Sequence, residues 1–155
     1  MSTKTAIKIL EDLAFEAKEK KYGDQPYLIR KKFSDKNANE LTQSIIAFIR
    51  LKGGQAERIS NTGRVIDTRK TYTDVLGHRR TIGATQWVPG TGTPGSADIS
   101  ATIAGTSVKI EVKHGRDRQS EAQKKYQAEI ERAGGVYFVA KTFEDFYHWY
   151  KRKFE

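Results

Sequence analysis

The sequence predicts an α/β fold in which helices flank a mixed central sheet. Three observations support this prediction. From residue 38 onward the expected elements follow the order helix, strand, two antiparallel strands, helix, strand and helix. Two runs of alternating apolar residues meet at residues 104–105, as in a β-hairpin. A continuous apolar run at 136–140 follows a glycine pair, which is typical of a buried strand. A mixed sheet covered by helices is the natural packing for this order.

Helices are expected over residues 4–21, 38–51, 120–133 and 143–153. The first two have apolar residues at helical spacing, and glycines follow both of them. Ser120 and Gln123 have the spacing of a capping box, and Thr142 is the expected cap of the last helix. The aromatic residues of that last helix are expected to pack or stack.

Strands are expected at residues 56–59, 86–88, 99–103, 106–112 and 136–140. Residues 60–85 are rich in turn formers and predict turns or a hairpin, and a glycine-rich stretch follows at 89–95. Residues 27–33 are short, mixed and basic, and they predict no element. The chain is long enough for one domain with a real core. We expect residues 1–36 to form an N-terminal helical arm and residues 37–155 to form the main domain.

The hairpin brings three charged residues together. If Ala104 and Gly105 form a two-residue turn, the apolar residues of both strands share one face. On the other face Asp98 then lies directly opposite Glu111, and cross-strand neighbours have Cβ atoms about 4.5–5.5 Å apart. Lys113 follows Glu111 by two residues and shares its face. The sequence therefore places two carboxylates and an ammonium at the end of the hairpin away from its turn.

This trio has two interpretations. Two adjacent carboxylates repel each other unless a cation neutralises them, and carboxylates are ligands that Mg²⁺ prefers. A bound metal can polarise a phosphoryl oxygen, and a neighbouring lysine can orient water or stabilise developing charge. The other interpretation is a cross-strand salt bridge among Asp98, Glu111 and Lys113, without any catalytic role.

Composition excludes several classes of site. The chain has 155 residues and no cysteine, which excludes a disulfide framework, a thiolate zinc site and a cysteine nucleophile. It has no apolar run near the roughly 20 residues that span a bilayer, and no signal-peptide pattern. We therefore expect no membrane partner and a cytoplasmic location, in a bacterium or a phage-infected cell.

The net charge of +9 indicates a polyanionic partner, most simply nucleic acid. Residues 37–97 carry eight basic and four acidic residues, the largest excess of the chain. Basic side chains among glycines suit a flexible surface that follows a phosphate backbone, although a solvated irregular loop has the same composition. The residues expected to contact nucleic acid are Arg58, Arg64, Arg69, Lys70, His78, Arg79, Arg80, Arg116 and Arg118.

Residues 94–98 (PGSAD) and 110–113 (IEVK) resemble the PD-(D/E)xK nuclease signature, in which Glu-x-Lys follows an acidic residue on the next strand. The chain then continues as 115–123 (GRDRQSEAQ) and 134–137 (GGVY), which resembles the VRR-NUC branch of that superfamily. The resemblance covers roughly residues 38–141. It implies a restriction-endonuclease-like αβββαβ core and a nuclease domain over residues 37–155.

The resemblance also implies roles for individual residues. Asp98 and Glu111 would bind Mg²⁺ or Mn²⁺ together with the backbone carbonyl of Val112. Glu40, on the second helix, matches an acidic residue that family members place near the metal, commonly through water. The alternative interpretation of Glu40 is an exposed glutamate in a first helical turn, without a role at the metal.

Two further residues would act on the substrate side of the site. Lys113 would position or activate the attacking water, and Gln123 would hold Lys113 or the scissile phosphate. Asp117 and Ser120 fit a turn and a helix cap better than a catalytic role. His78 could contact phosphate beside its neighbouring arginines.

The resulting hypothesis is a Mg²⁺-dependent DNA endonuclease that acts on branched DNA such as a flap or a Holliday junction. Stand-alone members of the branch resemble junction resolvases and tend to be homodimers, so a homodimer is expected. One alternative is a restriction-like or phage nuclease that cuts duplex or single-stranded DNA. Another is a non-catalytic basic module that binds nucleic acid.

Overall fold

The computed structural model describes residues 5–23, 25–90 and 92–155. They divide into two compact units, one formed by Met1–Ile59 and Gly95–Glu155 and the other by Ser60–Pro94. The first unit contains α1 (Ala6–Tyr22), α2 (Ala38–Leu51), β1 (Gln55–Arg58), β6 (Ile99–Ile103), β7 (Thr106–Val112), α3 (Glu121–Arg132), β8 (Val136–Ala140) and α4 (Phe143–Phe154). The second contains β2 (Arg64–Asp67), β3 (Lys70–Thr73), β4 (Arg79–Ile82) and β5 (Thr85–Val88).

A four-stranded sheet in the order β1-β6-β7-β8 forms the centre of the first unit. β1 and β6 are antiparallel, as are β6 and β7, whereas β7 and β8 are parallel. The two-residue turn at Ala104 and Gly105 has positive φ angles of 48° and 77°, which matches the twist of a tight hairpin. α3 connects β7 to β8, as a parallel pair requires. The predicted mixed sheet is therefore confirmed.

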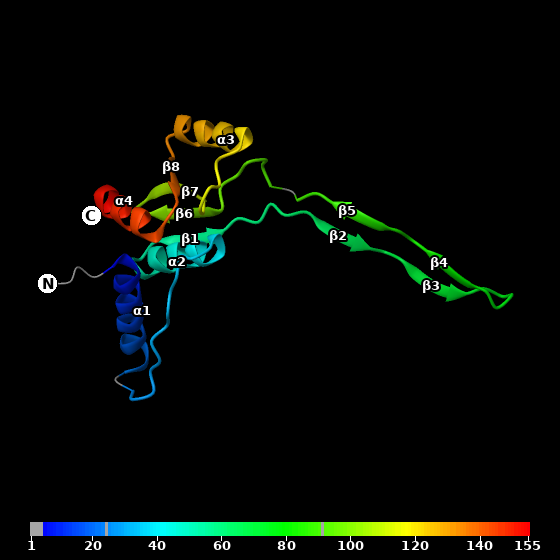
Figure 1. Ribbon diagram of the computed structural model, residues 1–155, viewed down its shortest axis with the longest axis horizontal. Coiled ribbons are helices and arrows are strands. Elements are labelled where there is room, and N and C mark those ends of the chain that lie inside the picture. The colour runs from blue at the N-terminus through cyan, green and yellow to red at the C-terminus, as the bar shows by residue number, and fades with distance from the viewer. Residues whose placement is uncertain (1–4, 24, 91) are drawn as a thin grey trace. The chain divides into compact units, whose positions relative to one another are not determined.

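The hairpin register is also confirmed, because Ile99 pairs with Ile110 and Ala101 pairs with Val108. One face of the sheet is consequently apolar. Its buried residues are Ile99, Ala101, Ile103, Val108, Ile110 and Val112. α2 and α4 pack on this face, and α3 lies on the opposite side of the sheet (Figure 1).

The aromatic side chains of α4 surround Phe48 of α2. The ring of Phe48 meets those of Phe143, Phe146, Tyr147 and Tyr150 edge to face, with centroids 5.0–5.9 Å apart. Such pairs contribute about 0.5–1.5 kcal/mol each beyond the area they bury. The expected packing of this helix is thereby confirmed.

The N-terminal helix packs on the same core. Ala6 and Leu10 of α1 are buried, and the Ala6 backbone N–H donates to Glu144 of α4 at 2.9 Å. The following segment returns to α4, where Asp35 accepts a hydrogen bond from the Phe143 N–H. The described part of residues 1–36 thus belongs to the first unit. The structure divides the chain at residues 60–94 rather than at the expected boundary after residue 36.

The helices predicted at 38–51, 120–133 and 143–153 are confirmed within one residue at each end. The first helix begins at Ala6, and residue 4 of its expected range lies outside the described residues. The strand predicted at 56–59 begins one residue earlier. In the expected glycine-rich stretch 89–95, residue 91 also lies outside the described part. No helix in the described ranges is long and apolar enough to cross a membrane.

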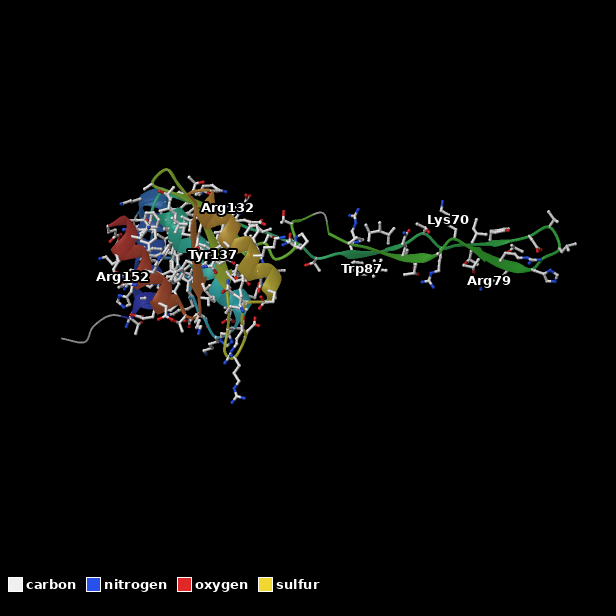
Figure 2. The ribbon with its side chains drawn as sticks, turned by 90° about the horizontal axis from the view of Figure 1, so that it is seen from above. Lys70, Arg79, Trp87, Arg132, Tyr137 and Arg152 are labelled. Atoms are coloured by element: carbon white, nitrogen blue, oxygen red, sulfur yellow. The ribbon has the colours of Figure 1, made fainter. Side chains whose placement is uncertain are left out.

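The second unit is a two-stranded antiparallel ribbon. β2 pairs with β5 and β3 pairs with β4 in one continuous register, from Arg64 opposite Val88 to Thr73 opposite Arg79. Thr68 joins the two pairs through a hydrogen bond from its N–H to the Ala84 carbonyl. Figure 2 shows Lys70, Arg79 and Trp87 along this ribbon. Of the two structures expected for residues 60–85, turns or a hairpin, the hairpin is confirmed.

Candidate active site

The polar face of the sheet brings Asp98 and Glu111 together. Asp98 directly precedes β6, and the observed register of β6 and β7 sets it opposite Glu111. A carboxylate oxygen of Asp98 accepts a hydrogen bond of 2.8 Å from the Val112 N–H. This bond holds the aspartate against the end of β7, and its other oxygen accepts no hydrogen bond from the residues that the structure describes, so it can reach a ligand.

Glu111 is buried, with an exposed fraction of 1%, and three side chains donate hydrogen bonds to it. Its Oε1 accepts from Gln123 Nε2 at 2.6 Å and lies 3.1 Å from Lys113 Nζ. Its Oε2 accepts from the Tyr137 hydroxyl at 3.4 Å. Since the donors come from α3, β8 and the end of β7 itself, the carboxylate is oriented from several sides.

Glu111 has an unusual affinity for protons. The pKa of Glu111 is raised from 4.5 to about 7, chiefly by burial and secondly by the nearby charge of Asp98, while hydrogen bonds from Lys113 and Tyr137 limit the rise. Burial also raises the pKa of Tyr137, so this hydroxyl stays protonated and can donate. A divalent cation between the two carboxylates would offset both the burial and the repulsion that together favour the protonated form of Glu111.

Lys113 lies between two carboxylates. Its backbone N–H donates to the Ala140 carbonyl of β8, and its Nζ lies 3.1 Å from Glu111 and 3.3 Å from Asp117. Burial lowers the pKa of Lys113, but the hydrogen bonds and charges of these carboxylates outweigh it, so the pKa lies above its usual value. Lys113 is therefore a fixed cation that suits positioning and charge stabilisation rather than proton abstraction.

Gln123 joins the start of α3 to the candidate site. Ser120 and Gln123 form the predicted capping box, in which the Gln123 side-chain oxygen accepts from the Ser120 N–H. The same side chain donates through Nε2 to Glu111. Gln123 thus bonds Glu111 and not Lys113, which was one of the two partners that the resemblance implies; contact with the scissile phosphate stays a prediction. The physical reason is that both ends of the amide already have partners.

Glu40 lies apart from this pair. It lines a cavity of about 240 Å³ with Phe33 and Ser34, and a hydrogen bond with the Ser34 side chain lowers the pKa of Glu40. Its Oε2 is buried without a hydrogen-bond partner in the described part of the chain. The preceding residue, Asn39, accepts from Arg58 at the end of β1. Because one helical residue turns the side chain by about 100°, Glu40 points to the N-terminal segment instead.

Among the described residues, no group of three or more His, Asp or Glu side chains is arranged to hold a metal. A metal at this site would therefore have only the two carboxylates of Asp98 and Glu111 and a backbone carbonyl as protein ligands. Mg²⁺ is commonly bound by one or two carboxylates, with water and substrate phosphate completing its shell. The residues present fit that mode of binding, and Glu40 does not join Asp98 and Glu111 as a direct ligand among the described residues; a role through water stays a prediction.

A basic cavity of about 420 Å³ adjoins the site. Lys113 and Asp117 line it on one side, and Arg118, Lys124 and Lys141 contribute further positive charge. Lys124 is paired with Glu121, whereas no ion pair of Arg118 or Lys141 occurs within the described ranges. A phosphate group suits such a cavity in size and charge.

Sequence reasoning missed Tyr137, Lys124 and Lys141, and it assigned Asp117 only to a turn. The alternation of side chains along the strand at 136–140 could have identified two of them. Tyr137, Val139 and Lys141 are each two residues apart, so their side chains lie on the same face of the sheet. That face is the one that carries Glu111, because β7 pairs with β8 with Glu111 opposite Val139.

The residues expected to contact nucleic acid fall in three places. Arg58 ends β1, and Arg116 and Arg118 lie between β7 and α3. The others occupy the ribbon of the second unit; they are Arg64, Arg69, Lys70, His78, Arg79 and Arg80.

No protein-family model matches the sequence, and no curated protein matches it either. The features that point to a function are those of the site itself: a buried Glu111 with a raised pKa beside Asp98, with a fixed ammonium and a basic cavity next to them.

Proposed function

We propose that the protein is a metal-dependent DNA endonuclease of the VRR-NUC type, which hydrolyses phosphodiester bonds in branched DNA. The observation that carries the proposal is the arrangement of Asp98, Glu111 and Lys113 on one face of the sheet. A structural salt bridge needs one carboxylate for one ammonium. Here a second carboxylate faces the first, and burial together with the charge of that second carboxylate keeps the pKa of Glu111 raised; a divalent cation would relieve the repulsion between the two.

The fold supports the same proposal. Within the first unit, α2 is followed by three antiparallel strands, a crossover helix and a fourth, parallel strand; the ribbon of the second unit is inserted between the first two of these strands. This order agrees with the restriction-endonuclease-like core that the resemblance implies. In such a core the acidic residues lie at the end of the central hairpin, as Asp98 and Glu111 do.

Asp98, Glu111 and the Val112 carbonyl would hold Mg²⁺ or Mn²⁺. The bound ion would supply Lewis-acid polarisation of the scissile phosphate and would make water more acidic. Lys113 would orient the attacking water and stabilise negative charge on the phosphoryl oxygens. Gln123 and Tyr137 would act as positioning residues, because each holds one oxygen of Glu111.

In the proposed reaction a water oxygen forms a bond to phosphorus as the bond from phosphorus to the 3′ oxygen breaks. The attacking water loses one proton to solvent and the 3′ oxygen takes one from solvent as it leaves, so the products are a 3′-hydroxyl and a 5′-phosphate. Lys141 and Arg118 in the basic cavity would hold a phosphate next to the one that is cleaved, which fixes the strand for in-line attack.

The test is cleavage of a four-way junction, a flap and a linear duplex, with Mg²⁺ and with EDTA. We expect Mg²⁺-dependent cleavage of the branched DNAs and a loss of at least about 100-fold in Lys113→Ala. Lys109→Ala is the matched control, since Lys109 lies on the same strand and face but bonds Ser100 instead. Wild-type rates in Lys113→Ala would contradict the role given to Lys113.

The other hypotheses correspond to defined outcomes. Binding without metal-dependent cleavage would indicate a non-catalytic nucleic-acid-binding module and would refute the nuclease. Equal cleavage of linear duplex or single strands would indicate a restriction-like nuclease and would remove structure selectivity.

We further propose a homodimer, in which two sites act on opposing strands; sedimentation of the protein at micromolar concentration tests this directly.

A further inference from the structure

The ribbon of the second unit exposes several large apolar side chains. Trp87 is 60% exposed, Leu76 is 74% exposed, and Val75 is fully exposed. An isolated two-stranded hairpin is marginally stable in water, and this one buries none of these side chains within its own unit. A surface of this kind is typical of a binding site for a partner.

Val75 and Leu76 are presented by an ordered turn at the tip of the ribbon. The Asp74 carboxylate accepts hydrogen bonds from the N–H groups of Leu76 and His78 and from Arg80 Nε, at 2.9–3.0 Å. The backbone of Asp74 closes the turn with His78 and with Gly77, whose φ is 83°. The two apolar residues thus project from a turn that is held by side-chain and backbone bonds.

Positive charge lies along the strands behind this tip. The two acidic residues of the ribbon are each paired, Asp67 with Arg69 and Asp74 with Arg80. Arg64, Lys70 and Arg79 have no acidic partner among the residues that the structure describes. The ribbon therefore offers unpaired cations as well as exposed apolar side chains.

We propose that this ribbon docks in the major groove of branched DNA and that Val75 and Leu76 form a wedge at the branch point. The inference rests on the proposed function, because it takes the DNA of that function as the occupant. In this proposal the tip of the ribbon recognises the branch. The residues of the candidate active site do not explain how a branch would be recognised.

The dimensions and charge favour this occupant. The ten residues from Arg64 to Thr73 span about 34 Å at about 3.4 Å per residue, which is about one turn of duplex. The major groove admits a two-stranded ribbon, and Arg64, Lys70 and Arg79 can contact its phosphates. A second copy of the chain would instead bring these cations against their own equivalents, which is repulsive.

The wedge also provides selectivity for a branch. Inserting apolar side chains into continuous duplex requires unstacking, at a cost of a few kcal/mol per step. At a branch point the stack is already interrupted, so that cost is smaller. Val75 and Leu76 therefore favour branched DNA over linear duplex without reading its sequence.

The test measures binding in EDTA, so that it does not depend on cleavage. Anisotropy of a labelled four-way junction and of a linear duplex is compared for wild type and for Val75→Ser/Leu76→Ser. We expect the double variant to bind the junction about 10-fold more weakly and the duplex unchanged. Ile29→Ser is the matched control, since Ile29 is an equally exposed apolar residue of the first unit.

A second pair of variants tests the charged strands. Lys70→Gln/Arg79→Gln should weaken binding to both DNAs and lower the slope of log K against log salt by about 2, since each neutralised phosphate contributes about 0.9 to that slope. Arg152→Gln/Lys153→Gln, on α4, is the control of equal charge. 2-Aminopurine at the branch should brighten with wild type and not with the wedge variant.

Wild-type junction preference in Val75→Ser/Leu76→Ser would overturn the inference. The inference would also be overturned if this double variant bound the junction normally but changed from a dimer to a monomer. The partner of the ribbon tip would then be a second copy of the chain. Tryptophan fluorescence and circular dichroism establish that each variant is folded. If branch binding behaves as expected and Mg²⁺ produces no cleavage, the proposed nuclease fails while the wedge stands.

Discussion

Gln123 Nε2 donates a hydrogen bond of 2.6 Å to Glu111 Oε1, while Gln123 Oε1 accepts from the backbone of Ser120. One amide therefore connects the cap of α3 to the buried carboxylate of β7. It fixes the distance between the helix and the sheet at the candidate site.

Replacing Gln123 by Met keeps its size and removes both bonds. We expect the Mg²⁺ concentration for half-maximal cleavage to rise about 10- to 100-fold, as is typical when a group that orients a metal ligand is removed. A titration of cleavage rate against Mg²⁺ measures this. Gln127→Met, one turn along α3, should match wild type, and an unchanged Mg²⁺ requirement in Gln123→Met would contradict the positioning role.

The stability of the metal-free protein should depend on pH through Glu111. Its pKa is about 7 in the folded chain against 4.5 for the ordinary carboxyl. Between these values the folded chain keeps a proton that the unfolded chain has released. The free energy of unfolding should therefore fall as pH rises from about 4.5 to 7, by about 3 kcal/mol at most.

Urea unfolding in EDTA across this pH range measures the effect, and Glu111→Gln should flatten it. An equal slope in Glu111→Gln would show that another group is responsible. Mg²⁺ stabilises the ionised carboxylate, so its addition at about pH 7.5, above the folded pKa, should raise the unfolding temperature of wild type. The same addition should leave Asp98→Ala unchanged.

Lys141→Gln should weaken binding of DNA in EDTA and lower the salt slope by about 1, because the neutral side chain no longer pairs with a phosphate in the basic cavity. Lys153→Gln on α4 provides the comparison, since α4 covers the other face of the sheet. A salt slope equal to that of wild type would exclude Lys141 from contact with phosphate.

Phe48→Ala should destabilise the first unit by about 3–5 kcal/mol, because it removes a fully buried ring that contacts four aromatic neighbours. Guanidinium unfolding followed by circular dichroism measures the loss. Phe154→Ala, at the partly buried end of α4, should cost much less. A similar loss in both would contradict a core centred on Phe48.

Local rules were enough to predict much of this protein. The two-residue turn and the period of two set the register of the hairpin, so Asp98 could be placed opposite Glu111 from sequence alone. The caps at Ser120 and Thr142 were predictable for the same reason, since each depends on residues within one helical turn.

Contacts between distant segments were decided only by the tertiary structure. The parallel pairing of β7 with β8 brings Tyr137 and Lys141 to the site, and the packing of α3 directs Gln123 to Glu111. The packing of α1 on the core and the direction of Glu40 depend likewise on segments far apart in the chain. Periodicity identifies the face on which a side chain lies, but only packing determines which distant element covers that face.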